Sequence, residues 1–209
     1  MEPAADSAET SRLLDEVRAG EPSAFDRLFA RHRGTLRRFV AFRLDPRIQA
    51  RLDASDIVQE THLEAYRRLS DFLTRRPMPF RVWLRKTAYE RLLKLRRNHV
   101  EAARRSVDRE LGLADRSSLL LAGSVLPGGS SPIQRLVRGE LVRRVREALA
   151  QLAPADRELL LMRNVEELPY RDIGCILDME PAAARKRYGR ALLRLRRILL
   201  DAGLLEENP

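Results

Sequence analysis

Cysteine is almost absent from this chain of 209 residues, which has only Cys175. A single thiol excludes an intramolecular disulfide and a zinc site built from several cysteines. Long apolar runs are also missing, because charged residues interrupt every stretch before it reaches the roughly 20 residues that a membrane-spanning helix needs. We therefore expect a cytoplasmic protein that has no membrane partner.

Lysine is scarce although the chain is basic. Only three of its 40 basic residues are lysine and the others are arginine; against 30 acids they leave a net charge of +10. An excess of this size points to an anionic partner. The planar guanidinium group suits both phosphate and the edges of bases.

Alternation of the kind that predicts strands is absent, and apolar residues recur instead at helical spacings. Residues 112–132 form an exception, because 11 of these 21 residues are Gly, Pro or Ser, which is typical of a linker. The sequence predicts an all-α fold of two helical domains, 10–111 and 133–202, joined by a flexible linker at 112–132. The expected helices cover residues 11–18, 24–44, 53–72, 80–110, 132–152, 154–164, 169–177 and 181–200.

The last two of these helices have the pattern of a helix-turn-helix. A turn of three residues, 178–180, separates them, and Pro181 stands in the first helical turn, where proline is favoured. Residues 181–200 hold seven bases and no acid, and the early residues of a recognition helix face the major groove. A solvated basic face is the alternative. The predicted contacts to duplex DNA are Tyr170, Arg171, Ala182, Ala183, Arg185, Lys186, Arg187 and Arg190.

Residues 53–64 are acidic, with four carboxylates and no Lys or Arg. When they are placed on a helix, Asp56, Gln59, Glu60 and Leu63 share the side opposite the apolar one. An exposed leucine among carboxylates resembles the centre of a protein contact. Single exposed leucines are also common, and acids favour a helix start, so the charge pattern by itself leaves both interpretations open.

Residues 85–105 are basic, with eight bases and two acids, and aromatic residues accompany them. Bases interleaved with aromatics suit single-stranded nucleic acid, whose phosphates need neutralising and whose bases stack. Phe80 and Trp83 are expected in the core, whereas Tyr89 fits a base contact or core packing equally well. The predicted contacts to unpaired DNA are Arg85, Lys86, Tyr89, Lys94, Arg96 and Arg97.

In this order and spacing, three segments resemble the extracytoplasmic-function group of bacterial sigma factors. Two of them, DASDIVQETHLEAYRRLSDF and PFRVWLRKTAYERLLKLRR, look like the second conserved region of that family. The third, ALAQLAPADRELLLMRNVEELPYRDIGCILDMEPAAARKRYGRALLRLR, looks like the fourth. With the linker between them, the resemblance covers about residues 10–200.

The resemblance implies a factor that directs RNA polymerase core to promoters and helps to open them. In the family, the helix matching Asp56, Gln59, Glu60 and Leu63 binds the clamp helices of the largest polymerase subunits. The basic helix holds the unpaired strand of the −10 element, and the last two helices read the −35 element as duplex. Many members are held by an anti-sigma factor, so such a partner is implied as well.

The chain departs from the family's pattern at three positions that matter below. Asp178 stands where glycine is usual in the turn, and an aspartate can still adopt the left-handed conformation. Glu180 replaces the usual Ser or Thr cap of the recognition helix. Glu90 stands where the family often has Asn, close to the expected path of the DNA.

Two other functions compete with a sigma factor. An autonomous helix-turn-helix regulator would bind duplex tightly by itself, but it would need neither the acidic helix nor the 85–105 stretch. An enzyme is a weaker alternative. Asp53, Asp56 and Glu60 suggest a carboxylate cluster for a metal, yet no Glu-x-x-His motif accompanies them, and the chain has no phosphate loop or nucleophile elbow. We therefore expect no catalytic residue, no metal and no cofactor.

Overall fold

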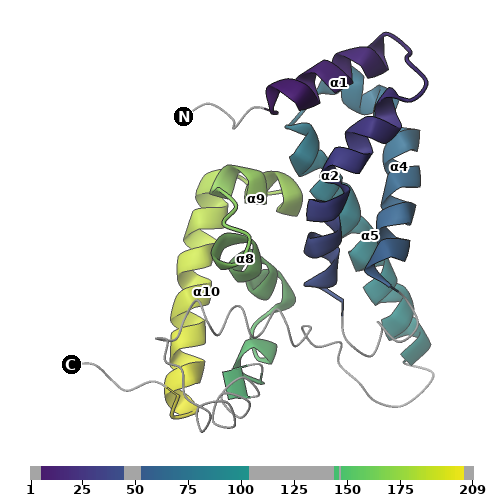
Figure 1. The fold of residues 1–209 in the computed structure, drawn as a ribbon. Helices are drawn as coiled ribbons and strands as arrows, with labels where there is room; N and C mark the ends of the chain where they lie inside the picture. Colours follow the sequence, from purple (N-terminus) through teal and green to yellow (C-terminus); the bar gives the residue numbers. More distant parts are fainter. Residues whose placement is uncertain (1–5, 45–52, 104–143, 146, 205–209) are drawn as a thin grey trace, which may run out of the picture. The chain divides into compact units, whose positions relative to one another are not determined.

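The computed structural model describes residues 6–44, 53–103, 144–145 and 147–204 (Figure 1). Within these ranges all regular structure is helical, which confirms the expected all-α fold. The expected linker, 112–132, lies outside the described residues, as do residues 104–110 of the basic helix. The helices with described bounds are α1 Ala8–Arg18, α2 Ala24–Ala41, α4 Ala54–Arg75, α5 Phe80–Ala103, α8 Pro154–Asn164, α9 Tyr170–Leu177 and α10 Pro181–Asp201. Of the expected helix 132–152, residues 144–145 and 147–150 are helical, and residues 132–143 lie outside the described part.

Local signals in the sequence account for where these helices begin and end. Asp53 and Asp56 form a capping box at the start of α4, in which side chains satisfy the first backbone N–H groups. Prolines occupy the first turn of α8 and of α10. At the end of α9, Asp178 adopts the left-handed conformation, with φ 53°. The aspartate thus takes the backbone conformation for which glycine is usual.

The described residues fall into two units, one built of α1, α2, α4 and α5 and the other of α8, α10 and most of α9. In the first unit, α4 and α5 pack against each other and against α2, and α1 covers α2. Its core is aromatic: the rings of Phe72 and Trp83 stack with centroids 4.5 Å apart, and Phe80 contacts both. Among the described helices, none is long and apolar enough to cross a membrane.

Residues before and within α1 attach that helix to the rest of the unit. The Asp6 carboxylate accepts a hydrogen bond from the backbone N–H of Phe80 at 2.9 Å, so it caps the start of α5 from a distant part of the chain. Thr10 lies 3.2 Å from Nε2 of His32, whose ring meets Phe80 edge-on. Burial lowers the pKa of His32 below its ordinary value, although Asp6 opposes this effect.

The second unit brings the turn of the helix-turn-helix very close to α9. A Cβ added at Gly174 would lie 2.5 Å from the carbonyl oxygen of Met179. The Gly174 carbonyl also accepts hydrogen bonds from the N–H groups of Asp178 and Met179. Glycine is therefore required at position 174 because the turn folds back onto the helix at that point.

Candidate functional site

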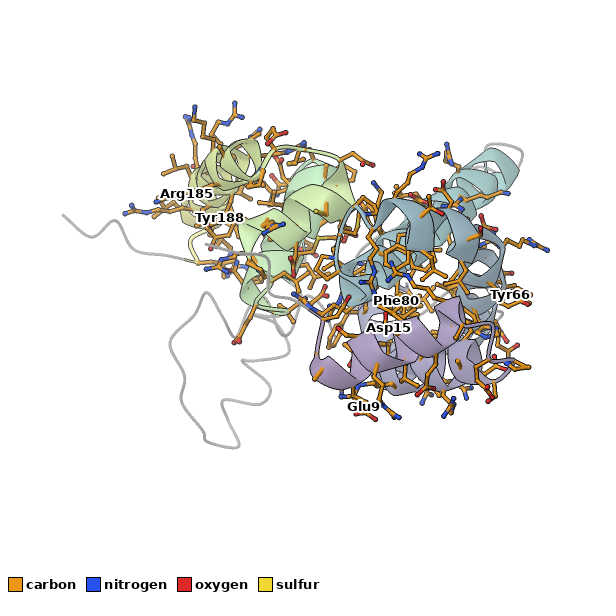
Figure 2. All side chains as sticks on the ribbon, turned by 90° about the horizontal axis from the view of Figure 1, so that it is seen from above. Glu9, Asp15, Tyr66, Phe80, Arg185 and Tyr188 are labelled. Atoms are coloured by element: carbon orange, nitrogen blue, oxygen red, sulfur yellow. The ribbon has the colours of Figure 1, made fainter. Side chains whose placement is uncertain are left out.

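The outer face of α4 combines polar groups with exposed apolar side chains. We define this face as Asp56, Gln59, Glu60, Leu63 and Tyr66. Leu63 is 56% exposed and Tyr66 is 63% exposed, whereas the inner side of the same helix is buried. Figure 2 shows Tyr66 at the outer edge of its unit. Leu63 thus lies on the side of α4 that the sequence indicated. Tyr66 was missed, although its spacing of three residues from Leu63 was the signal that places it on the same face.

Aromatic rings from α2 support this face from beneath. The His62 ring lies 5.2 Å from Phe25 and 4.6 Å from Phe29, between ring centroids. Its Nε2 is 3.0 Å from a carboxylate oxygen of Asp26. Tyr66 rests on the same Phe25 ring, at 5.4 Å. These contacts hold an aromatic side chain at the surface on a packed base.

Asp56 has a structural task besides any role at the surface. Its carboxylate accepts a hydrogen bond from the backbone N–H of Asp53 at 2.9 Å, which closes the capping box. Glu60 is engaged as well, in an ion pair with Arg91. Among the described residues, no three His, Cys, Asp or Glu side chains come together as metal ligands would.

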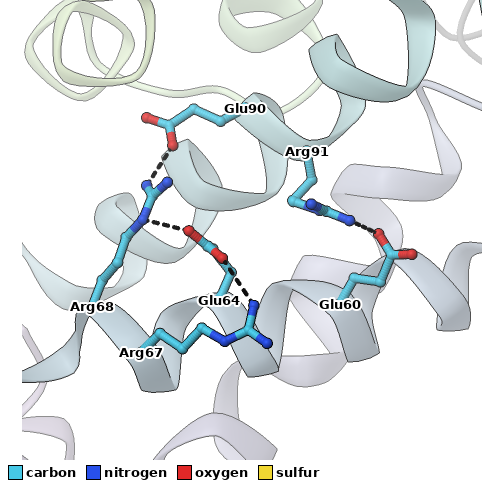
Figure 3. A network of polar contacts seen from close by, with 6 residues as sticks. All are labelled: Glu60, Glu64, Arg67, Arg68, Glu90 and Arg91. Atoms are coloured by element: carbon cyan, nitrogen blue, oxygen red, sulfur yellow. Dashed lines mark hydrogen bonds and ion pairs between the residues drawn. The ribbon is translucent and has the colours of Figure 1, made fainter. Parts of the chain in front are cut away.

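Ion pairs join the acidic helix α4 to the basic helix α5 (Figure 3). Glu60 pairs with Arg91, and Arg68 of α4 binds Glu64 at 2.7 Å and Glu90 of α5 at 2.6 Å. The hydrogen bond to Glu90, with the charge of Glu64, raises the pKa of the Arg68 guanidinium above its ordinary value. The two charged segments therefore neutralise each other in part, which the sequence analysis did not foresee.

The predicted contacts on α5 differ in how accessible they are. Lys94 and Arg97 are exposed, and Arg85 and Lys86 are half-buried; the side chain of Arg96 lies outside the described part. Tyr89 is only 8% exposed, so its ring cannot stack on a base in this structure. We withdraw Tyr89 from the DNA-binding set, because core packing accounts for it.

Helix α10 presents a basic side away from its buried side. Ala184, Ala191, Leu195 and Leu199 are buried, as the helical spacing predicts. Exposed residues of the predicted set are Ala182, Ala183, Arg185, Lys186 and Arg190 on α10 and Arg171 on α9.

Two residues of the predicted −35 set, Arg187 and Tyr170, are engaged in contacts within the second unit. The Nε of Arg187 donates to Asp156 of α8 at 2.6 Å, so this arginine is held within the unit. Tyr170 is half-buried; its ring meets Tyr188 edge-on at 5.7 Å, and the Arg163 guanidinium lies 5.0 Å from the ring. The helix-turn-helix therefore presents fewer free polar groups to a ligand than the sequence indicated.

Comparisons with known proteins identify both units. Residues 28–101 match the family model of sigma-70 region 2, and residues 142–195 match that of sigma-70 region 4. Together the two matches span more than half of the chain, and they contain α4, nearly all of α5, the whole of α9 and most of α10.

Curated relatives and solved structures agree with these matches. The chain is 28% identical to the ECF RNA polymerase sigma-E factor of Haemophilus influenzae, over 86% of this chain and 89% of that protein. It is also 28% identical to the RNA polymerase sigma-H factor of Pseudomonas aeruginosa, over 86% of this chain and 88% of that protein.

Two solved structures share the fold. One is CnrH in complex with the cytosolic domain of CnrY, with TM-score 0.54 and 24% identity over 91% of this chain and 96% of that one. The other is the sigma factor RpoE of Bartonella quintana in complex with the anti-sigma factor NepR, with TM-score 0.56 and 19% identity over 85% of this chain and 97% of that one. The chain belongs to the extracytoplasmic-function group of the sigma-70 family, and it is a sigma factor that directs RNA polymerase to promoters.

Proposed function

We propose that this sigma factor uses three surfaces for three tasks in transcription initiation. The outer face of α4 binds the clamp helices of the polymerase core, α5 holds the unpaired −10 strand, and α10 reads the −35 duplex. The domain of residues 10–111 would carry the first two surfaces and that of 133–202 the third. The protein breaks no covalent bond, since binding free energy alone favours the opened promoter, and it acts where polymerase and promoter lie, in the cytoplasm.

The exposed pair of Leu63 and Tyr66 is the single observation that best supports the polymerase contact. Large apolar side chains that stand exposed beside polar ones, on a rigid base, are typical of the centre of a protein interface. Gln59 and Asp56 supply the polar rim on one side. No such feature is needed by a regulator that binds DNA alone.

The proposed DNA contacts rest on charge and accessibility. On α5, Lys94 and Arg97 are exposed bases, which suits neutralisation of a single strand's phosphates. On α10, the small side chains of Ala182 and Ala183 allow close approach to the groove, while Lys186 and Arg190 reach bases or phosphates. We also propose an anti-sigma partner, because the structures of both solved relatives described above contain a bound partner.

The polymerase contact is tested by adding charge and removing the apolar centre. Asp56→Arg would also break the cap of α4, so the double variant Gln59→Arg with Leu63→Ala is the better choice. We expect it to lose most co-purification with core polymerase while its thermal unfolding stays unchanged. Thr74→Arg adds the same charge to the exposed last turn of α4 and should bind as the wild type does. Wild-type binding by the double variant would refute the contact.

The −35 contact is tested by run-off transcription with purified core polymerase on a promoter library. Replacing Arg185, Lys186 and Arg190 with alanine should abolish dependence on the −35 element and leave core binding intact. A matched triple variant removes the same charge from exposed arginines that pair within the first unit, away from the outer face of α4: Arg12, Arg27 and Arg75. Tight palindromic duplex binding by the isolated protein, with no effect of core polymerase, would instead favour an autonomous regulator.

A further inference from the structure

A buried carboxylate connects the recognition helix α10 to α8. Asp156 lies in the first turn of α8 and is 2% exposed. One of its oxygens accepts a hydrogen bond from Nε of Arg187 at 2.6 Å, and the other lies 3.3 Å from Nη2 of Arg194. Both oxygens of this carboxylate are therefore engaged by the same neighbouring helix.

The positions of the two arginines make this contact sensitive to the rotation and the axial position of α10. Arg187 and Arg194 are seven residues apart, which is two turns, so they lie on the same side of α10 about 10 Å apart along its axis. Their guanidinium groups converge on one point of α8. A rotation or a slide of α10 would lengthen at least one of the two contacts, and hydrogen bonds to carboxylates weaken steeply when their geometry is lost.

The apolar side of α10 is less directional where the recognition residues lie. Ala184 and Ala191 are both fully buried there, and an alanine has no side chain long enough to interlock with the facing helix. The buried leucines, Leu195 and Leu199, come only later in α10. A second directional contact between α10 and α8 is a hydrogen bond from the Tyr188 hydroxyl to Asn164 at 2.8 Å. The charged contact to Asp156 is therefore the feature best suited to define which side of α10 faces outward.

An ion pair with a buried carboxylate is not by itself a source of stability, because the cost of removing charge from water offsets much of the attraction. Here the carboxylate is 2% exposed, and the two arginine side chains are 33% and 55% exposed. The best-attested role of buried charged or polar groups is to select one packing arrangement of the helices among several of similar energy. Arg187 follows Lys186 on α10 and points about 100° further around the helix. A rotation of α10 by part of that angle would turn Lys186 and Arg190 away from their original direction and change the chemistry offered to a base.

We propose that Asp156 is a positioning residue for promoter recognition: through Arg187 and Arg194 it sets the rotation of α10 and thereby which side chains read the −35 element. The proposal rests on the proposed function of α10. It assigns a role in sequence selectivity to a residue that never touches DNA and that lies in α8 rather than in the helix-turn-helix.

The test compares Asp156→Asn with Leu199→Ala in the full chain. Asp156→Asn keeps the size of the side chain but removes the charge that both arginines share. Leu199 is a buried residue of α10, 1% exposed, that follows Arg194 by five positions and makes no charged contact, so Leu199→Ala serves as a control for lost stability alone. Both proteins are assayed with core polymerase on a library of −35 sequences, at a temperature at which each remains folded by circular dichroism.

We expect Asp156→Asn to reduce the preference between the best and the poorest −35 sequences about tenfold or more, with the −10 preference unchanged, and Leu199→Ala to keep both. Asp156→Glu, which retains the carboxylate, should keep most of the −35 preference. An unchanged −35 preference in Asp156→Asn, or an equal loss in Leu199→Ala, would overturn the positioning role. The alanine variant of Arg185, Lys186 and Arg190 separates failure of the positioning role from failure of the proposed function. If that variant also leaves −35 use unchanged, the proposed function of α10 fails as well; if it loses −35 use, only the role of Asp156 fails.

Discussion

Replacing Gly174 with alanine should destabilise the helix-turn-helix, although alanine normally strengthens a helix. The new Cβ would lie 2.5 Å from the Met179 carbonyl oxygen and 3.5 Å from the Pro181 nitrogen. Both neighbours are backbone atoms, and the turn that carries them is hydrogen bonded to Gly174 itself. No side chain can rotate away to make room, so the backbone of the turn must move by nearly an ångström.

Gly189 provides a matched control in the same unit. It lies within α10, and a Cβ there would meet nothing within 4 Å. Both substitutions gain roughly 1 kcal/mol from the helix propensity of alanine over glycine, so that gain cancels in the comparison. What remains is the cost of overpacking at position 174, typically about 1–3 kcal/mol. Because the clash is with backbone, we expect Gly174→Ala to be less stable than Gly189→Ala by at least about 2 kcal/mol, within that range.

Urea unfolding followed by far-ultraviolet circular dichroism measures this difference. The chain's single tryptophan, Trp83, lies in the other unit, so its fluorescence transition supplies an internal reference that neither substitution should move. If Gly174→Ala proves as stable as Gly189→Ala, then the turn does not approach α9 as closely as described, and the reasoning for a required glycine is wrong.

Three further predictions concern a helix cap, a histidine and an ion pair. Glu180 begins α10 without a side-chain cap, so Glu180→Asp, which keeps the charge, should raise the free energy of unfolding by about 1 kcal/mol in urea titrations. The lowered pKa of His32 means that the unfolded chain takes up this proton first, so stability falls as the pH drops below roughly 6.5, by at most about 1.4 kcal/mol per pH unit. His32→Gln should remove that part of the slope, and an unchanged slope would contradict it. Glu60→Gln should release Arg91 for a phosphate of single-stranded −10 DNA. A plot of log binding constant against log salt concentration should then steepen by about 0.7, and identical slopes for variant and wild type would show that Arg91 does not change partner.

Most of the fold could be predicted from the sequence because local rules determine it. Proline positions, the capping box at Asp53 and the periodic apolar residues set helix bounds that agree with the structure to within a few residues at most ends. Even the unusual Asp178 adopts the left-handed conformation, which the sequence analysis regarded as accessible to an aspartate. Each of these features depends on residues within a few positions of one another.

The contacts that the sequence analysis missed join residues far apart in the chain. Arg187 and Asp156 are 31 positions apart, as are Arg91 and Glu60. Helical spacing shows which side of a helix is charged, but it does not show which charges of another helix will meet that side. Tyr89 was misjudged for a related reason. It lies opposite Phe80 around α5, where Val82 is buried too, and a helix that is apolar on several sides is enclosed rather than exposed.

The ion pair between Glu60 and Arg91 suggests how the two surfaces of the first unit influence each other. Glu60 belongs to the proposed polymerase-binding face and Arg91 to the helix proposed to hold DNA. A basic group of the polymerase that binds Glu60 competes with Arg91 and leaves that arginine free for a phosphate. Any ligand that prefers one of two arrangements shifts their populations, and the coupling is reciprocal. Both side chains are partly exposed, so the pair contributes at most about 1 kcal/mol, which limits the coupling to roughly fivefold. An effect of that size supports the opened promoter only together with the other contacts, and it would make core polymerase a modest activator of DNA binding rather than an absolute switch.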